Sequence, residues 1–336
     1  MDVEEILTAL QSVGASDYPP FLRGTLRESR LASASSFMKN DRATDDTTST
    51  DRQPSREEAI ALLKGGLGDA LLMAAANYVM PVFWVAAQEG RPLIAGNGSA
   101  FLLDAGQGPF LVTAGHVYEG YRRCRESHPD AACIVGDLRF DIERRKIAHD
   151  QAYDVATFKV TSEEVAQWRH RGRYAITGSQ ASWPPPPPQV GRGMFLVGFP
   201  GDGRRLHPYR GKSIVEVDWV GYSVLSIAES VSASGITLVL DHEQSIDIGE
   251  RQEPPADWAL GGCSGAPILT FVEHCGVFTW RLGGIVRVGG PMCEDGPKLL
   301  KASRADCLNP DATINPFPDP MVYARIRQRQ WADQSD

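Results

Sequence analysis

The sequence has no long apolar run. Its most apolar stretch, residues 60–80, is interrupted by Lys64 and Asp69, and no segment reaches the ~20 apolar residues of a membrane-spanning helix. The segment MDVEEILTAL at residues 1–10 lacks the basic region and apolar core of a secretory signal. We therefore expect no membrane association, no export and a cytoplasmic location.

The sequence also lacks a surplus of basic residues. It has 34 Lys and Arg against 42 Asp and Glu, a formal net charge of -8. Nucleic-acid binding needs a basic surface that neutralises phosphates, so a nucleic acid is not expected as a partner. The small arginine clusters at residues 122–125 and 204–205 are interpreted as solvated loops, although a local basic site is not excluded.

Metal-binding patterns are absent as well. No CxxC pair occurs, and no His/Cys cluster has the spacing of zinc ligands. The six cysteines are Cys124, Cys133, Cys263, Cys275, Cys293 and Cys307. A cytosolic chain of this size does not need disulfides, so we expect free thiols, no structural metal and no cofactor.

The N-terminal part of the chain differs from the rest. Residues 1–56 are expected to form an extension that ends in a flexible linker, because residues 40–55 are polar and rich in Asp and Thr. A helix is expected over 57–78, with Ser55 as N-cap and Glu58 completing a capping box. The apolar residues expected to form one face of it are Ile60, Leu63, Leu67, Leu71 and Ala74. This helix packs on the core or offers a contact surface to a partner.

Two blocks of short β runs follow, punctuated by Gly and Pro. We expect a first β-barrel over 79–165 and a second over 191–336, because many short strands without long helices favour paired barrels. The connector 166–190 contains five prolines at 184–188, expected to be extended. They form either a stiff interdomain loop or a ligand for a proline-binding module. A C-terminal helix is expected at 320–331.

Three short segments carry chemistry. Gly262-Cys263-Ser264-Gly265-Ala266 suits a tight turn that exposes a serine, His116 follows the apolar run 110–113, and Asp154 opens the apolar run 155–158. Serine catalysis needs a base within hydrogen-bond reach and a carboxylate that orients this base. Alone, each residue is more simply a structural histidine or a turn residue, but together they predict a His116, Asp154, Ser264 triad. The amides of Gly262 and Ser264 would form an oxyanion hole.

These segments resemble the chymotrypsin-like (trypsin-like) serine peptidases, in particular bacterial-type intracellular members. Residues 284–289 (GIVRVG) are similar to the substrate-binding strand of that family, and 198–200 (GFP) to the start of the second barrel in its bacterial members. The resemblance covers about residues 79–325. It implies an all-β fold of two six-stranded antiparallel barrels, and a serine endopeptidase that acts through an acyl-enzyme.

Three residues depart from the family pattern. Cys263 replaces the usual acidic residue before the serine, which argues against activation by N-terminal cleavage. Trp258 stands at the position that often sets the primary pocket, which argues against a preference for Lys or Arg. Arg287 replaces a small residue and either favours an acidic substrate residue or pairs with Asp154. The residues expected to form the substrate pocket are Trp258, Arg287, Val288 and Gly289.

Other readings remain open. The atypical residues suit a catalytically silent peptidase fold that acts as a protein-binding module. An esterase of the α/β-hydrolase type is disfavoured because its serine comes first in the chain. The partner of an active enzyme would be a protein or peptide substrate, and residues 1–75 could engage a regulatory partner.

Overall fold

The computed structural model describes residues 56–88, 91–178, 183–208, 215–219, 221–233, 235–240, 260–274, 277–289 and 298–315. The chain divides into two compact units, residues 1–61 and 62–336, and the architecture below is that of the second unit. The predicted linker at 40–55, the N-cap Ser55, the pocket residue Trp258 and the helix at 320–331 lie outside the described residues.

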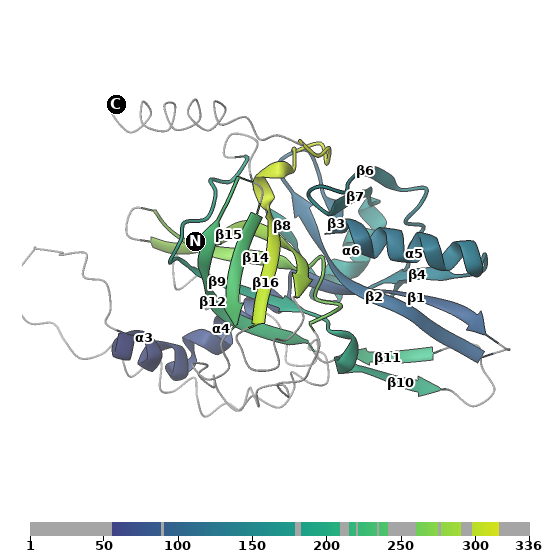
Figure 1. Cartoon of the computed structure of the whole chain (residues 1–336), viewed down its shortest axis with the longest axis horizontal. Helices are drawn as coiled ribbons and strands as arrows, with labels where there is room; N and C mark the ends of the chain where they lie inside the picture. The colour runs from purple at the N-terminus through teal and green to yellow at the C-terminus, as the bar shows by residue number, and fades with distance from the viewer. Residues whose placement is uncertain are drawn as a thin grey trace, which may run out of the picture. The chain divides into compact units, whose positions relative to one another are not determined.

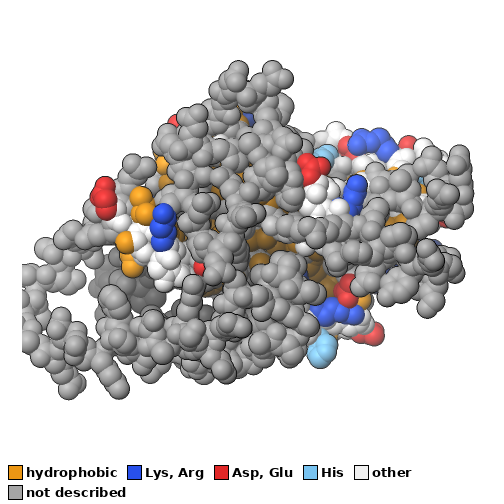
Figure 2. Space-filling model, turned by 90° about the horizontal axis from the view of Figure 1, so that it is seen from below, with side chains coloured by type: hydrophobic (Ala, Val, Ile, Leu, Met, Phe, Trp, Pro, Cys, Tyr) orange, Lys and Arg blue, Asp and Glu red, His pale blue; other side chains and the backbone are white. Residues whose placement is uncertain are grey.

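The helical segment expected over 57–78 consists of α3 (Arg56–Leu62), the π-helix η4 (Leu63–Leu67) and α4 (Gly68–Ala76) (Figure 1). Gly66 breaks the helical path with a φ of 113°. This kink separates two helical segments, so the predicted single apolar face is wrong: Leu71 is buried, whereas Leu67 is 47% exposed. Figure 2 shows apolar side chains exposed beside charged ones at α3 and η4.

The first β block forms a sheet of eight strands with the order β5-β4-β1-β2-β3-β7-β6, and β8 pairs with β2. Its strands are β1 (Val79–Gln88), β2 (Arg91–Asp104), β3 (Phe110–Ala114), β4 (Ala132–Val135), β5 (Leu138–Arg139), β6 (Lys146–Asp150), β7 (Val155–Lys159) and β8 (Ala175–Thr177). All neighbours are antiparallel except β2 and β8. The pairings among the described residues do not close this sheet, so a first barrel of six strands stays a prediction.

The helices α5 (Gly115–Ser127) and α6 (Ser162–His170) pack on this sheet through a shared hydrophobic core. The end of α6 and all of β8 fall within 166–190, which the sequence suggested was only a connector. Residues 183–188 contain neither helix nor strand.

Both faces of the first sheet are buried at its central strands β2 and β3. Side chains alternate between faces along a strand, and in β2 Phe101 contributes to one core, whereas Leu102 contributes to another with Tyr118 of α5. The core that contains Phe101 also includes Phe195 and Ile285 of the second block. Burial of both faces explains why β3 reads as the continuous apolar run FLV followed by Thr and Ala.

The second β block contains a closed antiparallel barrel of six strands, as expected. The strands are β9 (Gly193–Gly198), β12 (Tyr222–Val231), β13 (Gly235–Leu240), β14 (Pro267–His274), β15 (Val277–Gly289) and β16 (Lys298–Arg304). A separate hairpin of β10 (Arg204–Pro208) and β11 (Val215–Trp219) extends from it, and short 3-10 turns occur at Gly201–Gly203 and Ala305–Cys307. No helix in the described part of the chain is long and apolar enough to cross a membrane.

Candidate active site

His116 lies at the junction of β3 and α5. The buried strand β3 ends at Ala114, and His116 is the second residue of the helix, with 45% of its side chain exposed. Gly115 between them has no room for a side chain, because a Cβ there would lie 2.9 Å from His149 Nε2 and 3.1 Å from Asp154 Oδ1. The sequence Ala-Gly-His therefore allows the turn from strand to helix to close tightly around a carboxylate.

Asp154 caps the helix that carries His116. Its Oδ1 accepts a 2.7 Å hydrogen bond from the His116 amide, and its carbonyl accepts one of 2.9 Å from the Gly115 amide. These amides belong to the first turn of α5, where the helix has no cap of its own and its dipole favours a negative charge. Asp154 adopts a left-handed φ of 53°, which Asp tolerates better than most residues.

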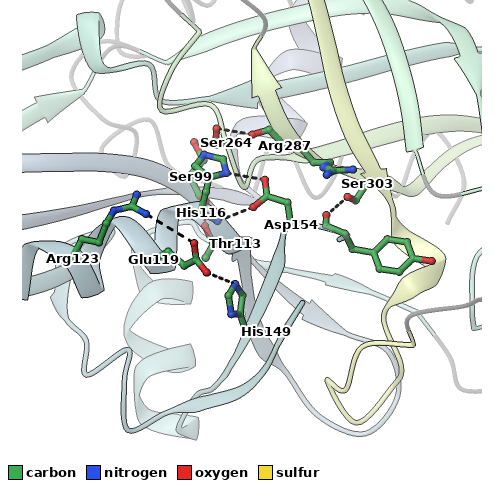
Figure 3. A network of polar contacts seen from close by, with 11 residues as sticks. Ser99, Thr113, His116, Glu119, Arg123, His149, Asp154, Ser264, Arg287 and Ser303 are labelled. Atoms are coloured by element: carbon green, nitrogen blue, oxygen red, sulfur yellow. Dashed lines mark hydrogen bonds and ion pairs between the residues drawn. The ribbon is translucent and has the colours of Figure 1, made fainter. Parts of the chain in front are cut away.

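The same carboxylate orients the imidazole. Asp154 Oδ2 lies 2.7 Å from His116 Nδ1 (Figure 3). Because an ionised carboxylate only accepts hydrogen bonds, Nδ1 carries the hydrogen and Nε2 is left as the basic nitrogen. The Asp154 turn is also held by the barrel, since the Ser303 hydroxyl of β16 donates to the Tyr153 carbonyl. The geometry is that of a histidine base with its orienting carboxylate.

Ser264 lies in a turn that two glycines make possible. Gly262 and Gly265 have left-handed φ values of 97° and 89°. A Cβ at Gly262 would lie 2.2 Å from Asn97 Nδ2, and one at Gly265 would lie 2.1 Å from the Ser99 carbonyl oxygen. Backbone conformation and space therefore both require glycine on each side of the Cys263-Ser264 pair.

Ser99 of β2 fastens this turn to the first sheet. Its amide donates a 2.8 Å hydrogen bond to the Ser264 carbonyl, and its hydroxyl donates one of 2.8 Å to the Gly262 carbonyl. The same hydroxyl accepts from the Phe199 amide at 3.1 Å, and the Ser99 carbonyl accepts from the Thr113 hydroxyl at 2.6 Å. Since Thr113 lies three residues before His116, Ser99 brings the serine turn to the end of the strand that carries the histidine.

The amides of Gly262 and Ser264 are available to bind an anion. The Gly261 carbonyl accepts from the Gly201 amide, and the Cys263 carbonyl accepts from the Ala266 amide. In a trans peptide the N–H points opposite to the C=O, so the two following amides point away from these partners. Neither amide donates a hydrogen bond to any other described residue, which suits the predicted oxyanion hole.

The Ser264 hydroxyl donates a 3.0 Å hydrogen bond to the Arg287 carbonyl of β15 (Figure 3). Within the described part of the chain, it forms no hydrogen bond with His116. The hydroxyl must therefore release the Arg287 carbonyl before it can donate to His116, and catalytic hydrogen bonds are often not formed in a site without substrate.

The expected substrate pocket is described only in part. Arg287, Val288 and Gly289 form the end of β15, and a bulge in the pairing with β16 falls between Val286 and Val288. The Asp154 carboxylate pairs with His116 and forms no ion pair with Arg287. The expected alternative in which Arg287 pairs with Asp154 is therefore not observed.

Cys263, beside the serine, is completely buried, and burial raises the pKa of its thiol to about 12. A Cβ at Gly198 would lie 2.9 Å from its Sγ, so the thiol packs against β9. A neutral buried thiol is a poor nucleophile. Cys124, Cys133, Cys263 and Cys307 are free thiols, and the described residues contain no group of His, Cys, Asp and Glu that could hold a metal.

Sequence reasoning did not single out several polar residues of the site. Ser99 and Thr113 are completely buried, and the polar run Gly96-Asn97-Gly98-Ser99 in front of the apolar 100–103 was the available signal. Glu119 and His149, behind the candidate triad, were missed because no local pattern links them.

Comparison of the chain with protein-family models and with curated proteins gives no match.

Proposed function

We propose that this protein is a serine endopeptidase that hydrolyses peptide bonds through His116, Asp154 and Ser264. The observation that carries the proposal is the 2.7 Å contact of His116 Nδ1 with a carboxylate that also caps the helix of His116. A histidine held in this tautomer presents its Nε2 as a base. Ser99 fastens the Ser264 turn beside it.

The reaction has two halves. His116 Nε2 takes the Ser264 proton while Oγ bonds to the scissile carbonyl carbon, and the amides of Gly262 and Ser264 stabilise the oxyanion. Collapse of this intermediate breaks the C–N bond, His116 delivers the proton to the leaving amine, and an acyl-enzyme remains. Water then adds with His116 as base and releases the acid and the free serine. Throughout, Asp154 stabilises the imidazolium.

The resemblance of the three segments to chymotrypsin-like peptidases supports this chemistry. It also suggests how the two β blocks correspond to the two barrels of that family. In this proposal the eight-stranded sheet corresponds to the first of two barrels and the closed barrel to the second. The substrate is a protein or peptide, the chemistry needs no cofactor, and the enzyme works in the cytoplasm, where its free thiols persist.

Cleavage of a diverse peptide library tests the proposal. Incubation with the full chain is expected to release fragments that share a preferred residue at the scissile bond. Ser264→Ala, prepared identically, is expected to release none. Equal cleavage by the two proteins would assign the activity to a contaminant, and no cleavage by well-folded wild type would count against an endopeptidase.

A second candidate is a catalytically silent fold that binds a protein. The hydrogen bond of the Ser264 hydroxyl to the Arg287 carbonyl favours it, because the nucleophile is directed away from the base. Under this alternative, Ser264→Ala retains binding to the partner and wild type turns over no peptide. Cleavage by wild type alone would reject it.

A further inference from the structure

A second histidine lies behind the candidate triad. His149 stands on β6 opposite Ala156 of β7, and its side chain is 15% exposed. Its Nε2 is buried and has no hydrogen-bond partner among the described residues. The nearest acidic atom is Oε1 of Glu119, at 3.7 Å, which is too long for a hydrogen bond. The imidazole is therefore poised next to a carboxylate without bonding to it.

This imidazole also adjoins the carboxylate of the triad. His149 Nε2 and Asp154 Oδ1 both lie within 3.1 Å of the position that a Cβ at Gly115 would occupy. That oxygen is the one that accepts the His116 amide. Figure 3 shows the Glu119–His149 pair beneath His116 and Asp154. A charge on His149 would thus act directly on the group that orients the base.

The helix α5 contributes two side chains beside His149, those of Glu119 and Tyr118. On α5, Glu119 also accepts a 2.8 Å hydrogen bond from Gln151 and lies 4.0 Å from Arg123. The Tyr118 ring meets the imidazole edge-on at 5.4 Å.

On β6 itself, the charged neighbours point to other partners. Lys146 places its Nζ over the Tyr118 ring, and the Asp150 carboxylate accepts the Tyr153 amide. The acidic group closest to His149 Nε2 is thus the Glu119 carboxylate, at 3.7 Å. The Asp154 carboxylate lies on the other side of the Gly115 Cβ position and forms no ion pair with His149.

We infer that His149, together with Glu119, is a positioning residue of the triad, and that its protonation weakens His116 as a base. The inference rests on the proposed function. A protonated His149 gains an ion pair with Glu119 and places a positive charge beside Asp154. Asp154 must stabilise the imidazolium that forms on His116 in the transition state, and a second cation opposes that stabilisation. The site is therefore most active when both histidines are neutral.

The rate of labelling by a fluorophosphonate probe tests this without a known substrate. Measured on the full chain between about pH 5 and pH 9, the logarithm of the wild-type rate should fall towards acid pH more steeply than the slope of one expected from a single histidine. His149→Gln cannot be protonated, so its slope should be about one. His170→Gln, which changes an exposed histidine at the end of α6, should retain the wild-type profile.

Glu119→Gln gives a second test that leaves His149 in place. Without the carboxylate, the protonated imidazole loses its ion pair, so the acid fall of the rate should move to lower pH. Thermal melting of each variant reports whether it is folded.

Superimposable profiles of wild type and His149→Gln would overturn the inference, and so would an equal loss of rate at every pH, which indicates packing alone. If labelling requires Ser264 but its slope is one in wild type, the inference fails and the proposed function stands. If wild type is not labelled at any pH, both fail.

Discussion

The Ser99 amide donates a 2.8 Å hydrogen bond to the Ser264 carbonyl. This bond links the second strand of the first sheet to the nucleophile turn of the barrel. Ala100, the next residue, pairs with Thr113 in the strand that leads to His116. Backbone hydrogen bonds across two strands thus help to set the position of Ser264 relative to His116.

Ser99→Ala should loosen this connection. The variant leaves the buried Gly262 carbonyl and Phe199 amide without the hydroxyl that joins them, and an unsatisfied buried polar group costs about 1–3 kcal/mol. Urea denaturation should show a loss of that size together with slower fluorophosphonate labelling. Ser127→Ala, at the exposed end of α5, is the control and should change neither quantity. A stability equal to wild type would show that the hydrogen bonds of the Ser99 hydroxyl do not stabilise the fold.

Gly265→Ala should disturb the turn itself. The new Cβ would lie 2.1 Å from the Ser99 carbonyl oxygen at a residue whose φ is 89°. Left-handed strain and overpacking together predict a loss of about 2–5 kcal/mol in the free energy of unfolding. Gly261→Ala in the same turn meets nothing within 4 Å and serves as the matched control. Equal stabilities of the two variants would contradict the described turn.

Asp154→Asn separates orientation from capping. An asparagine retains an acceptor for the His116 amide and tolerates the left-handed backbone, so the melting temperature should change little. It can donate to Nδ1 and thus favours the wrong tautomer of His116, which predicts a roughly 10³- to 10⁴-fold slower labelling rate. Replacement of a triad carboxylate is expected to cost far more than tenfold in rate. A labelling rate within about tenfold of wild type would therefore contradict a catalytic role for Asp154.

The buried thiol beside the nucleophile predicts an alkaline loss of stability. The folded pKa of Cys263 is about 12, above that of an unfolded cysteine, so its contribution is complete at low pH and is lost as pH rises past about 8.5. Between pH 8 and pH 10 the stability advantage of wild type over Cys263→Ala should shrink by about 2 kcal/mol. Urea denaturation at the two pH values measures it. An unchanged difference would mean that the thiol ionises in the folded protein.

The local backbone of the candidate site could be predicted in part, because short segments encode it. The glycines around Ser264 and the Ala-Gly step before His116 have conformational reasons that are visible in the sequence. The closed barrel of the second block was expected from its short strands. The turn features depend on residues close together in the chain, whereas closure of the barrel joins strands as distant as β9 and β14.

Features that depend on distant residues were not predictable. Ser99, Glu119 and His149 acquire their roles only when β2, α5 and β6 are brought together. The predicted apolar face that included Leu67 failed because the kink at Gly66 interrupts the helix. The direction of the Ser264 hydroxyl towards Arg287 depends on a strand that follows the serine.

Mass spectrometry of the chain after reaction with a fluorophosphonate at neutral pH tests whether Ser264 is an activated nucleophile. We expect one adduct per chain, mapped by proteolysis to Ser264, at a rate that falls by several orders of magnitude in a folded His116→Ala variant. An unmodified wild-type chain, an adduct elsewhere, or equal rates in wild type and His116→Ala would contradict that expectation.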